Sequence, residues 1–276
     1  MARSNPVKVA VVRRAERLTP HMIRLVLGAP EFADNGFTDK YVKLLFPTAG
    51  LKYPEPLDMA VIREQVPPEY WPVSRTYTIR AWDPVTAEVT IDFVYHGDEG
   101  IAGPWAAAAK ADDEVWFVGP GGAYKPDPAA DWHLLVGDES ALPAIGAAVE
   151  ALPPGARARV IVEVEDASEE QKFSGSGEVE LTWLHRAGAA TAPGDQLVAA
   201  VEGLTFEPGD VQVFVHGEAG FVQRLRAPLK ERGITRDRLS ISGYWRQGKN
   251  EDGWQAEKAE TAKAERERLE REAAKA

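Results

Sequence analysis

The residues whose types and spacing best suit chemistry lie at positions 74–80, which carry the sequence Ser-Arg-Thr-Tyr-Thr-Ile-Arg. A run rich in β-branched and aromatic residues and bounded by prolines is typical of a β-strand. Arg75, Tyr77 and Arg80 suit a planar, partly apolar ligand that carries a phosphate, because an aromatic ring can lie on the ligand's face while a guanidinium binds phosphate oxygens. The alternative is a surface strand whose charges point to solvent.

A second motif follows at positions 91–105. The segment Ile-Asp-Phe-Val-Tyr-His-Gly alternates like a strand, and Gly100-Ile101-Ala102-Gly103-Pro104 then leads into an alanine-rich stretch. Alanine is the best helix former and proline fits a first helical turn, so we expect a helix to begin near Gly103. The free N–H groups at such a helix start suit an anion such as a pyrophosphate.

Polar motifs in the second half of the chain follow segments that we expect to be strands. They are Gly137-Asp138-Glu139-Ser140, Glu163-Val164-Glu165-Asp166, His216-Gly217-Glu218 and Gly243-Tyr244-Trp245-Arg246. Ligands of doubly wound sheets bind beyond the carboxyl ends of the strands. No Gly-x-Gly-x-x-Gly fingerprint occurs, so we expect the backbone and Ser140 at the start of a helix to hold any dinucleotide. Glu163, Glu165 or Asp166 could accept from a ribose hydroxyl and repel a 2′-phosphate, which favours NADH over NADPH.

The elements that must position these motifs form two groups. Residues 7–12, 22–27, 41–46, 75–82, 89–95 and 114–118 are predicted strands with hardly a helix between them, which indicates a six-stranded antiparallel β-barrel. The proline-rich insertion 47–72 is expected to be a loop, either crossing the barrel mouth or lying on the surface. After residues 120–131, predicted strands at 132–137, 159–164, 179–184, 211–216 and 238–242 alternate with helices from 138 to about 152, near 196–202 and at 221–232, which indicates a doubly wound, mostly parallel α/β sheet.

Composition limits the remaining classes of function. The 276 residues include no cysteine and only five histidines, none with metal-ligand spacing, so no metal site is expected and redox chemistry requires a bound cofactor. The net charge of −11 argues against broad nucleic-acid binding.

We expect no membrane span, a cytoplasmic location and a monomer. The charged segment 251–276 is predicted to be helical, either solvated or acting as a lid or partner-binding helix.

These motifs, taken in order, resemble a known family. The segment 75–80 resembles the Arg-x-Tyr-Thr/Ser signature of flavin reductases of the ferredoxin-reductase type. Together with the segments 92–97, 137–145, 216–218 and 243–248, it makes residues 6–250 similar to the siderophore-interacting protein family of bacterial ferric-siderophore reductases. The resemblance implies an FAD-binding barrel at 1–125, an NAD(P)H-binding α/β domain at 126–250 and a charged helical tail at 251–276.

The resemblance also implies roles for individual residues. The implied FAD site comprises Arg75, Thr76, Tyr77, Thr78, Arg80, Asp92, Phe93, Val94, His96, Ala102, Gly103 and Trp105. In this site Arg75 contacts the flavin pyrophosphate and Tyr77 stacks on the isoalloxazine ring. A main-chain N–H of Thr78 donates a hydrogen bond near N5, and Arg80 either binds phosphate or has a structural role. The implied NAD(P)H site comprises Gly137, Asp138, Glu139, Ser140, Glu165, His216, Gly217, Glu218 and Trp245. For His96 and His216 a role as a core histidine is the alternative, and Trp245 could pack on either cofactor.

The activity implied is electron transfer from NAD(P)H through FAD to a ferric siderophore, with no catalytic side chain of the protein taking part. Catecholate chelates of Fe(III) are anionic, so Lys43 and Arg246 are the principal candidates to bind them, followed by Lys249, Lys52 and Arg63. Three alternatives stay open: a general flavin or ferric-chelate reductase, a carrier that binds siderophore or flavin without turnover, and ferredoxin as the electron donor.

Overall fold

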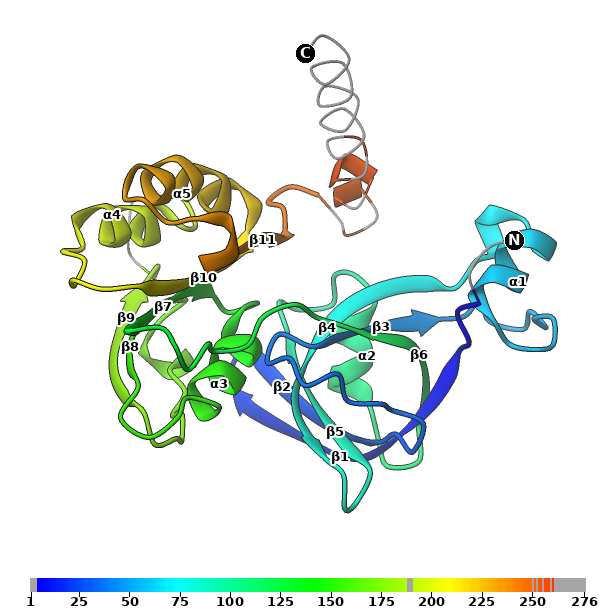
Figure 1. The fold of residues 1–276 in the computed structure, drawn as a ribbon. Coiled ribbons are helices and arrows are strands. Elements are labelled where there is room, and N and C mark those ends of the chain that lie inside the picture. Colours follow the sequence, from blue (N-terminus) through cyan, green and yellow to red (C-terminus); the bar gives the residue numbers. More distant parts are fainter. Residues whose placement is uncertain are drawn as a thin grey trace, which may run out of the picture.

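The computed structural model describes residues 4–187 and 191–249, together with residues 251, 253, 254, 256–258 and 260. Its first half is a closed barrel in the order β1-β2-β5-β4-β3-β6 (Figure 1), which confirms the predicted six-stranded architecture. Every neighbouring pair is antiparallel. The strands are β1 (Lys8–Thr19), β2 (Met22–Gly28), β3 (Tyr41–Phe46), β4 (Val73–Asp83), β5 (Glu88–Val94) and β6 (Glu114–Gly121).

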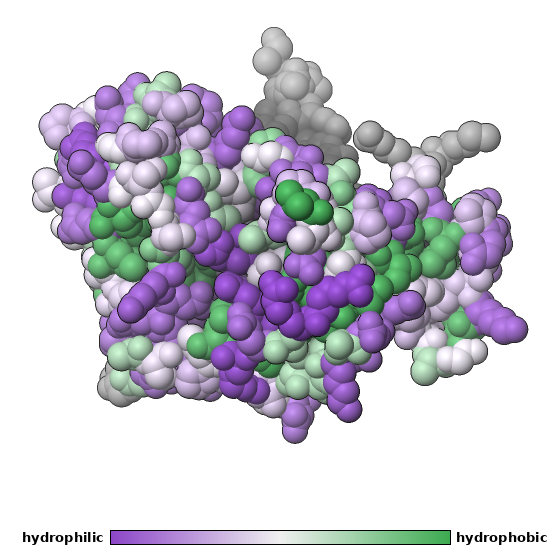
Figure 2. Space-filling view, turned by 90° about the horizontal axis from the view of Figure 1, so that it is seen from below, coloured by the Kyte–Doolittle hydropathy of each residue, from purple (hydrophilic) through white to green (hydrophobic). Residues whose placement is uncertain are grey.

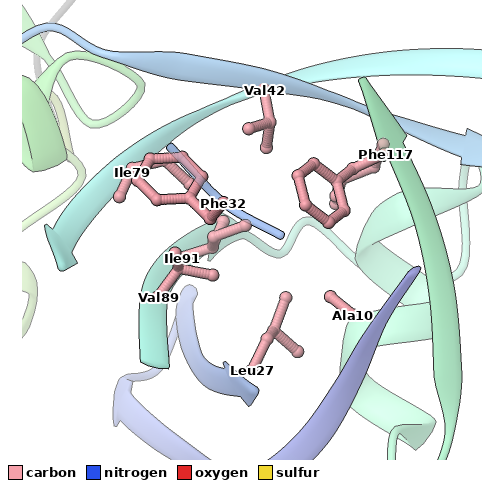
Figure 3. Close-up of a pocket in the computed structure, with 9 residues that line it drawn as sticks. Ala10, Leu27, Phe32, Val42, Ile79, Val89, Ile91 and Phe117 are labelled. Carbon is pink, nitrogen blue, oxygen red and sulfur yellow. The ribbon is translucent and has the colours of Figure 1, made fainter. Parts of the chain in front are cut away.

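Side chains fill the barrel interior. All six strands send apolar residues inward, and the close-up in Figure 3 shows them converging on one cavity with Phe32 from the loop after β2. The cavity measures about 10 Å³, which is at the lower limit for a single water molecule. The barrel interior therefore has no room for a group of the size of a flavin.

The insertion 47–72 packs on the outer face of the barrel. It contains α1 (Met59–Gln65), capped by Asp58, and a short 3-10 helix, η1 (Pro68–Tyr70), so the expectation of a loop throughout is wrong. Met59 and Ile62 form a cluster with Leu45, whose neighbour Leu44 points into the barrel. Because successive strand residues point to opposite faces, the insertion covers the outside of β3 and does not cross the barrel mouth.

The second half is a five-stranded parallel sheet in the order β11-β10-β7-β8-β9 (Figure 1). Helix α3 packs on one face of the sheet, and α4 and α5 pack on the other, which confirms the doubly wound prediction. The strands are β7 (Trp132–Asp138), β8 (Arg157–Val164), β9 (Glu178–His185), β10 (Val211–Glu218) and β11 (Leu239–Trp245). The helices are α3 (Leu142–Glu150), α4 (Asp195–Gly203) and α5 (Ala219–Glu231), with 3-10 turns η2 (Ala167–Glu169) and η3 (Arg236–Arg238).

Two boundaries differ from the prediction in ways that concern the site. Strand β7 continues through Asp138, and α3 starts only at Leu142, so the polar residues between them form a turn and not a helix. Strand β11 includes Tyr244 and Trp245, which were expected to follow it. The predicted helix near Gly103 is α2 (Ala102–Ala108), and its Ala106 packs into the barrel core.

Contacts between the barrel and the sheet fix the two parts against each other. Arg80 of β4 forms a bidentate pair with Glu150 of α3, at 2.7 and 2.6 Å. Glu169 of η2 is buried and accepts from the backbone N–H of His21 at 2.9 Å and from the Thr19 hydroxyl at 2.5 Å, in the turn between β1 and β2. These polar contacts hold α3 against β4, and hold η2, which follows the carboxyl end of β8, against the turn between β1 and β2.

The surface seen from below in Figure 2 is mostly hydrophilic, with apolar residues in scattered patches. In the part of the chain that the structure describes, no helix combines the length and the apolar character needed to cross a bilayer.

Candidate flavin and nicotinamide site

The Arg-x-Tyr-Thr strand is open on one side. Strand β4 pairs with β3 from Val73 to Thr78, but its pairing with β5 begins only at Ile79. The backbone N–H of Ile79 donates to the carbonyl oxygen of Lys40, next to β3, at 2.8 Å. Successive N–H groups of a strand point to opposite sides, so the N–H of Thr76, three residues earlier, points away from β3. The N–H of Thr76 donates instead to a carboxylate oxygen of Glu251 at 3.1 Å. The N–H of Thr76 thus lies outside the sheet ladder and binds the Glu251 carboxylate. A binding site for a phosphate or a flavin oxygen requires a donor of this kind.

Aromatic side chains pack next to this open side. Tyr77 lies against Phe93 of β5, with ring centroids 4.3 Å apart and tilted by 40°. Phe93 in turn contacts Trp105 of α2, which meets Phe46 edge to face. Burial, and then the nearby Glu251, raise the pKa of the Tyr77 phenol, so the ring is neutral at physiological pH. The residues present fit the flat, apolar ring system of a flavin beside β4.

The charged residues expected at the flavin are engaged by the protein. Asp92 is buried and receives two hydrogen bonds from Arg24 of β2, at 2.6 and 2.7 Å. Arg80 pairs with Glu150, as described above, while Arg75 donates to the carbonyl oxygen of Ser74 at 2.8 Å. Arg24 was missed in the sequence, because its position opposite Asp92 follows from the register of β2 and β5.

The remaining predicted flavin residues lie on two elements. Val94 ends β5, and Ala102 and Gly103 are buried at the start of α2, whose first turn has no side-chain cap. A Cβ at Gly103 would lie 3.5 Å from the carbonyl oxygen of Val94, so β5 and α2 approach closely at this point. His96 is exposed on the loop between them. Thr78 is buried, and its side chain forms a hydrogen bond with the hydroxyl of Tyr244.

Asp138 joins the carboxyl ends of three strands of the sheet. It is buried and accepts hydrogen bonds from Ser140 N at 2.9 Å, Ser140 Oγ at 2.5 Å, Glu218 N at 2.7 Å and Trp245 Nε1 at 2.8 Å. A Cβ at Gly217, where φ is 142°, would lie 2.6 Å from the same carboxylate. Asp138 therefore shapes this edge and orients the indole of Trp245, with its hydrogen-bonding capacity used inside the protein.

Other residues predicted at the nicotinamide also have structural partners. Glu218 caps α5, with its carboxylate accepting from Gly220 N and from Phe221 N. A Cβ at Gly137 would lie 2.5 Å from that of Ala141, so only glycine allows this tight turn. His216 is buried between Phe214 and Tyr244 and bonds Ser240 Oγ through Nε2 at 2.9 Å, as a core histidine does.

Arg186, which the sequence did not single out, lies at the carboxyl edge next to two predicted residues. It follows β9, and its guanidinium donates hydrogen bonds to both carboxylate oxygens of Glu139 and to Glu165 at 3.3 Å. Nothing in the local pattern around Arg186 indicates these partners, because Glu139 is 47 residues away in the chain.

Cationic side chains gather where β3, β11 and the tail meet. Lys43 is exposed on β3, opposite Thr76. Lys258 of the tail donates to the carbonyl oxygen of Gly243 at 3.1 Å, and burial, then Lys43, lower its pKa against the opposing effect of Glu251. Lys249 pairs with Glu257, and Arg246 lies near the same carboxylate. Arg63 lies apart, over the Trp71 ring in the insertion, and Lys52 is exposed on that insertion.

The described part of the tail contacts both domains. Glu251 reaches β4 of the barrel, while Lys258 and Trp254 contact Gly243 in β11 of the sheet. The described residues of the tail, up to Glu260, therefore pack on both domains, while its predicted role as a solvated helix or as a lid or partner-binding helix stays a prediction; residues 261–276 lie outside the described part.

A closed barrel with an Arg-x-Tyr-Thr strand open on one side, followed by a doubly wound sheet, is a fold shared with the ferredoxin reductase in carbazole 1,9a-dioxygenase, at a TM-score of 0.62 and 14% identity. The chain belongs to the siderophore-interacting protein family. Residues 11–124 match the model of the siderophore-interacting FAD-binding domain, and residues 130–248 match the model of the siderophore-interacting protein.

Individual relatives agree with this family. The chain is 42% identical to an uncharacterized protein of Mycobacterium tuberculosis, covering 94% of this chain and 97% of that one. It is 37% identical to the ferric vibriobactin reductase ViuB of Vibrio cholerae, covering 69% of this chain and 71% of the relative. The crystal structure of a siderophore utilization protein from T. fusca superposes with a TM-score of 0.77 at 36% identity, covering 89% of this chain and 95% of that one.

Proposed function

We propose that this protein is an FAD-dependent reductase that passes electrons from NADH to a ferric siderophore and releases Fe(II) in the cytoplasm. The open side of β4 carries this proposal, because it combines a backbone donor at Thr76 that lies outside the sheet ladder with the aromatic ring of Tyr77, which Phe93 and Trp105 back. The family's FAD-binding domain and relatives named as ferric reductases support the flavin and the ferric-reductase activity, although one of these relatives is named as NADPH-dependent.

FAD, when bound, supplies the conversion of a two-electron donor into single-electron steps to iron. The protein's part is to hold and orient it. Tyr77 would stack on the ring system, with Phe93 and Trp105 behind it. The backbone N–H groups of Thr76 and Thr78, on the side away from β3, would donate to acceptor atoms. Arg75, Val94, His96, Ala102 and Gly103 complete the proposed site, while Arg80 and Asp92 support it through Glu150 and Arg24.

The nicotinamide donor is assigned to the carboxyl edge of the sheet, beside β4. Gly137 and Gly217 keep the turns narrow, Ser140 starts the segment leading into α3, and Glu165 has the exposed carboxylate that suits a ribose hydroxyl. Asp138 and Glu218 position this edge through their buried hydrogen bonds. The indole of Trp245, held through Nε1 by Asp138, can pack on either cofactor. An excess of acidic residues discourages an acidic ferredoxin as donor.

The substrate is proposed to be an anionic, catecholate-type ferric siderophore that binds to a monomer at the cationic mouth of the site. Lys43 lies on β3, and Arg246 and Lys249 lie on the segment after β11. Lys258 of the tail contacts Gly243 of β11 and lies near Lys43. The charges of Lys43, Arg246 and Lys249 would attract the chelate and place its iron close to the flavin edge.

Anaerobic flavin bleaching tests the proposal. NADH, and NADPH in a parallel sample, is added to the purified holoprotein, followed by a ferric siderophore and a ferrous-iron trap. Bleaching by the nicotinamide, reversed by the siderophore as Fe(II) forms, is the expected result. Equal reoxidation by ferric citrate would favour a general ferric-chelate reductase. A protein purified without flavin would favour a carrier, and flavin that neither nucleotide bleaches would contradict the nicotinamide donor.

A further inference from the structure

Arg186 is surrounded by carboxylates from three parts of the sheet edge. Its Nη1 donates to Glu139 Oε2 at 2.8 Å, and its Nη2 binds both Glu139 Oε1 and Glu165 Oε2, the latter at 3.3 Å. Nη1 also lies 3.6 Å from Glu163 Oε1. Glu139 belongs to the turn after β7, Glu163 to β8, and Glu165 follows β8 directly. One guanidinium therefore cross-links the ends of β7, β8 and β9.

The members of this cluster differ in exposure. The Glu165 side chain is 44% exposed, compared with 21% for Arg186, 11% for Glu139 and 1% for Glu163. Glu163 also accepts from Gly194 N at 2.8 Å, and its Oε2 has no hydrogen-bond partner in the described part of the chain. Glu165 and the outer edge of Arg186 are thus the groups that a ligand at this edge would meet.

The cluster lies where a dinucleotide places its adenosine ribose. The strand order reverses between β7 and β10, and dinucleotides lie across that switch point. In doubly wound sheets an acidic residue near the end of the second strand accepts from the ribose 2′-hydroxyl, whereas an arginine there accommodates a 2′-phosphate. This chain has both groups, Glu165 and Arg186, bound to each other.

We infer that Arg186, engaged by Glu139 and Glu165, determines the choice between a ribose diol and a ribose 2′-phosphate. This inference rests on the nicotinamide donor of the proposed function. A 2′-phosphate has to take the guanidinium away from its bidentate carboxylate while it approaches Glu165 itself. A diol needs neither change, because its hydroxyls donate to Glu165 and leave the Arg186–Glu139 pair intact. The engaged arginine therefore favours NADH.

Nucleotide fragments test the inference independently of turnover. Binding of 5′-AMP and of 2′,5′-ADP to the FAD-loaded protein is measured by calorimetry for wild type, Glu165→Gln and Glu139→Gln/Glu165→Gln. We expect Glu165→Gln to raise the affinity for 2′,5′-ADP relative to 5′-AMP by about tenfold, and the double variant to raise it further, because each change removes a carboxylate near the phosphate. Adding Arg186→Met to the double variant should abolish the gain.

The controls separate the possible failures. Glu170→Gln changes an exposed glutamate that pairs with His185 in the same region and should keep the wild-type ratio. If both fragments bind but the ratio stays unchanged in the single and double variants, the cluster is a structural cross-link and the inference is wrong. If neither fragment binds to wild type, the nicotinamide donor of the proposed function fails, and the inference falls with it.

Discussion

The backbone N–H of Thr76 donates to the carboxylate of Glu251, which lies 175 residues further along the chain, at a distance of 3.1 Å. The contact joins the start of the tail to β4, the strand with the Arg-x-Tyr-Thr sequence. A carboxylate thus lies in the region where an anionic cofactor is proposed to bind, and the two compete for the same positive potential.

Glu251→Gln is expected to tighten FAD binding. The substitution removes a negative charge beside Tyr77 and Thr76 and weakens the hold of the tail on this N–H group. Removal of a charge at this distance should decrease the FAD dissociation constant about three- to tenfold. Titration of the apoprotein with FAD, followed by flavin fluorescence, measures it. Glu260→Gln, at an exposed position of the same tail, is the control, and equal affinities in both variants would contradict the competition.

Tyr77→Ala is expected to lose FAD on purification, whereas Tyr77→Phe should keep it. The ring of Tyr77 packs on Phe93 at 4.3 Å, so alanine removes the proposed stacking surface and leaves Phe93 uncovered. Phenylalanine keeps the surface. The ratio of visible to ultraviolet absorbance of the purified variants gives the flavin content. Full occupancy in Tyr77→Ala would show that the stacking assignment is wrong.

Much of the fold could be predicted because its signals are local. Alternation marked the barrel strands, and the succession of strands and helices marked the doubly wound sheet. The position of the insertion could not be decided, because it depends on which of two adjacent leucines, Leu44 or Leu45, points inward, and that is fixed only when the barrel closes.

The site shows the same division. The segment 74–80 could be predicted as a candidate site from residue types within one strand, but the partners of its neighbours could not. Arg24 meets Asp92 through strand register, and Arg186 meets Glu139 through the approach of separate loops. Asp138 looks like a ligand-binding residue in sequence, yet its bonds to Glu218 and Trp245 show that it also holds the sheet edge together.

Lys43→Ala or Arg246→Ala is expected to raise the apparent KM for an anionic ferric siderophore about three- to tenfold, with flavin content unchanged. Each removes one positive charge from the proposed mouth of the site. Steady-state kinetics at low and high salt measure the effect, which salt should reduce. Lys230→Ala, on the exposed side of α5, is the matched control. Unchanged kinetics in both site variants would remove these residues from the substrate site.

Acid is expected to destabilise the protein partly through His216. Burial, and then Lys258 and Arg226, lower the pKa of His216 from 6.5 to about 3. Because the folded pKa lies below the unfolded one, the unfolded state binds the proton first. The stabilising contribution is therefore fully present above pH 6.5 and is lost as the pH falls towards 3.

Between pH 7.5 and 5.5 this loss amounts to about 1.4 kcal/mol of unfolding free energy. His216→Gln lacks the titrating group and should lose that much less than wild type over the same interval, although it is less stable at neutral pH because the packing against Phe214 and Tyr244 changes. Urea unfolding at the two pH values measures the difference. His96→Gln replaces an exposed histidine and should keep the wild-type dependence. A His216→Gln protein with the same pH dependence as wild type would show that His216 is not the group responsible.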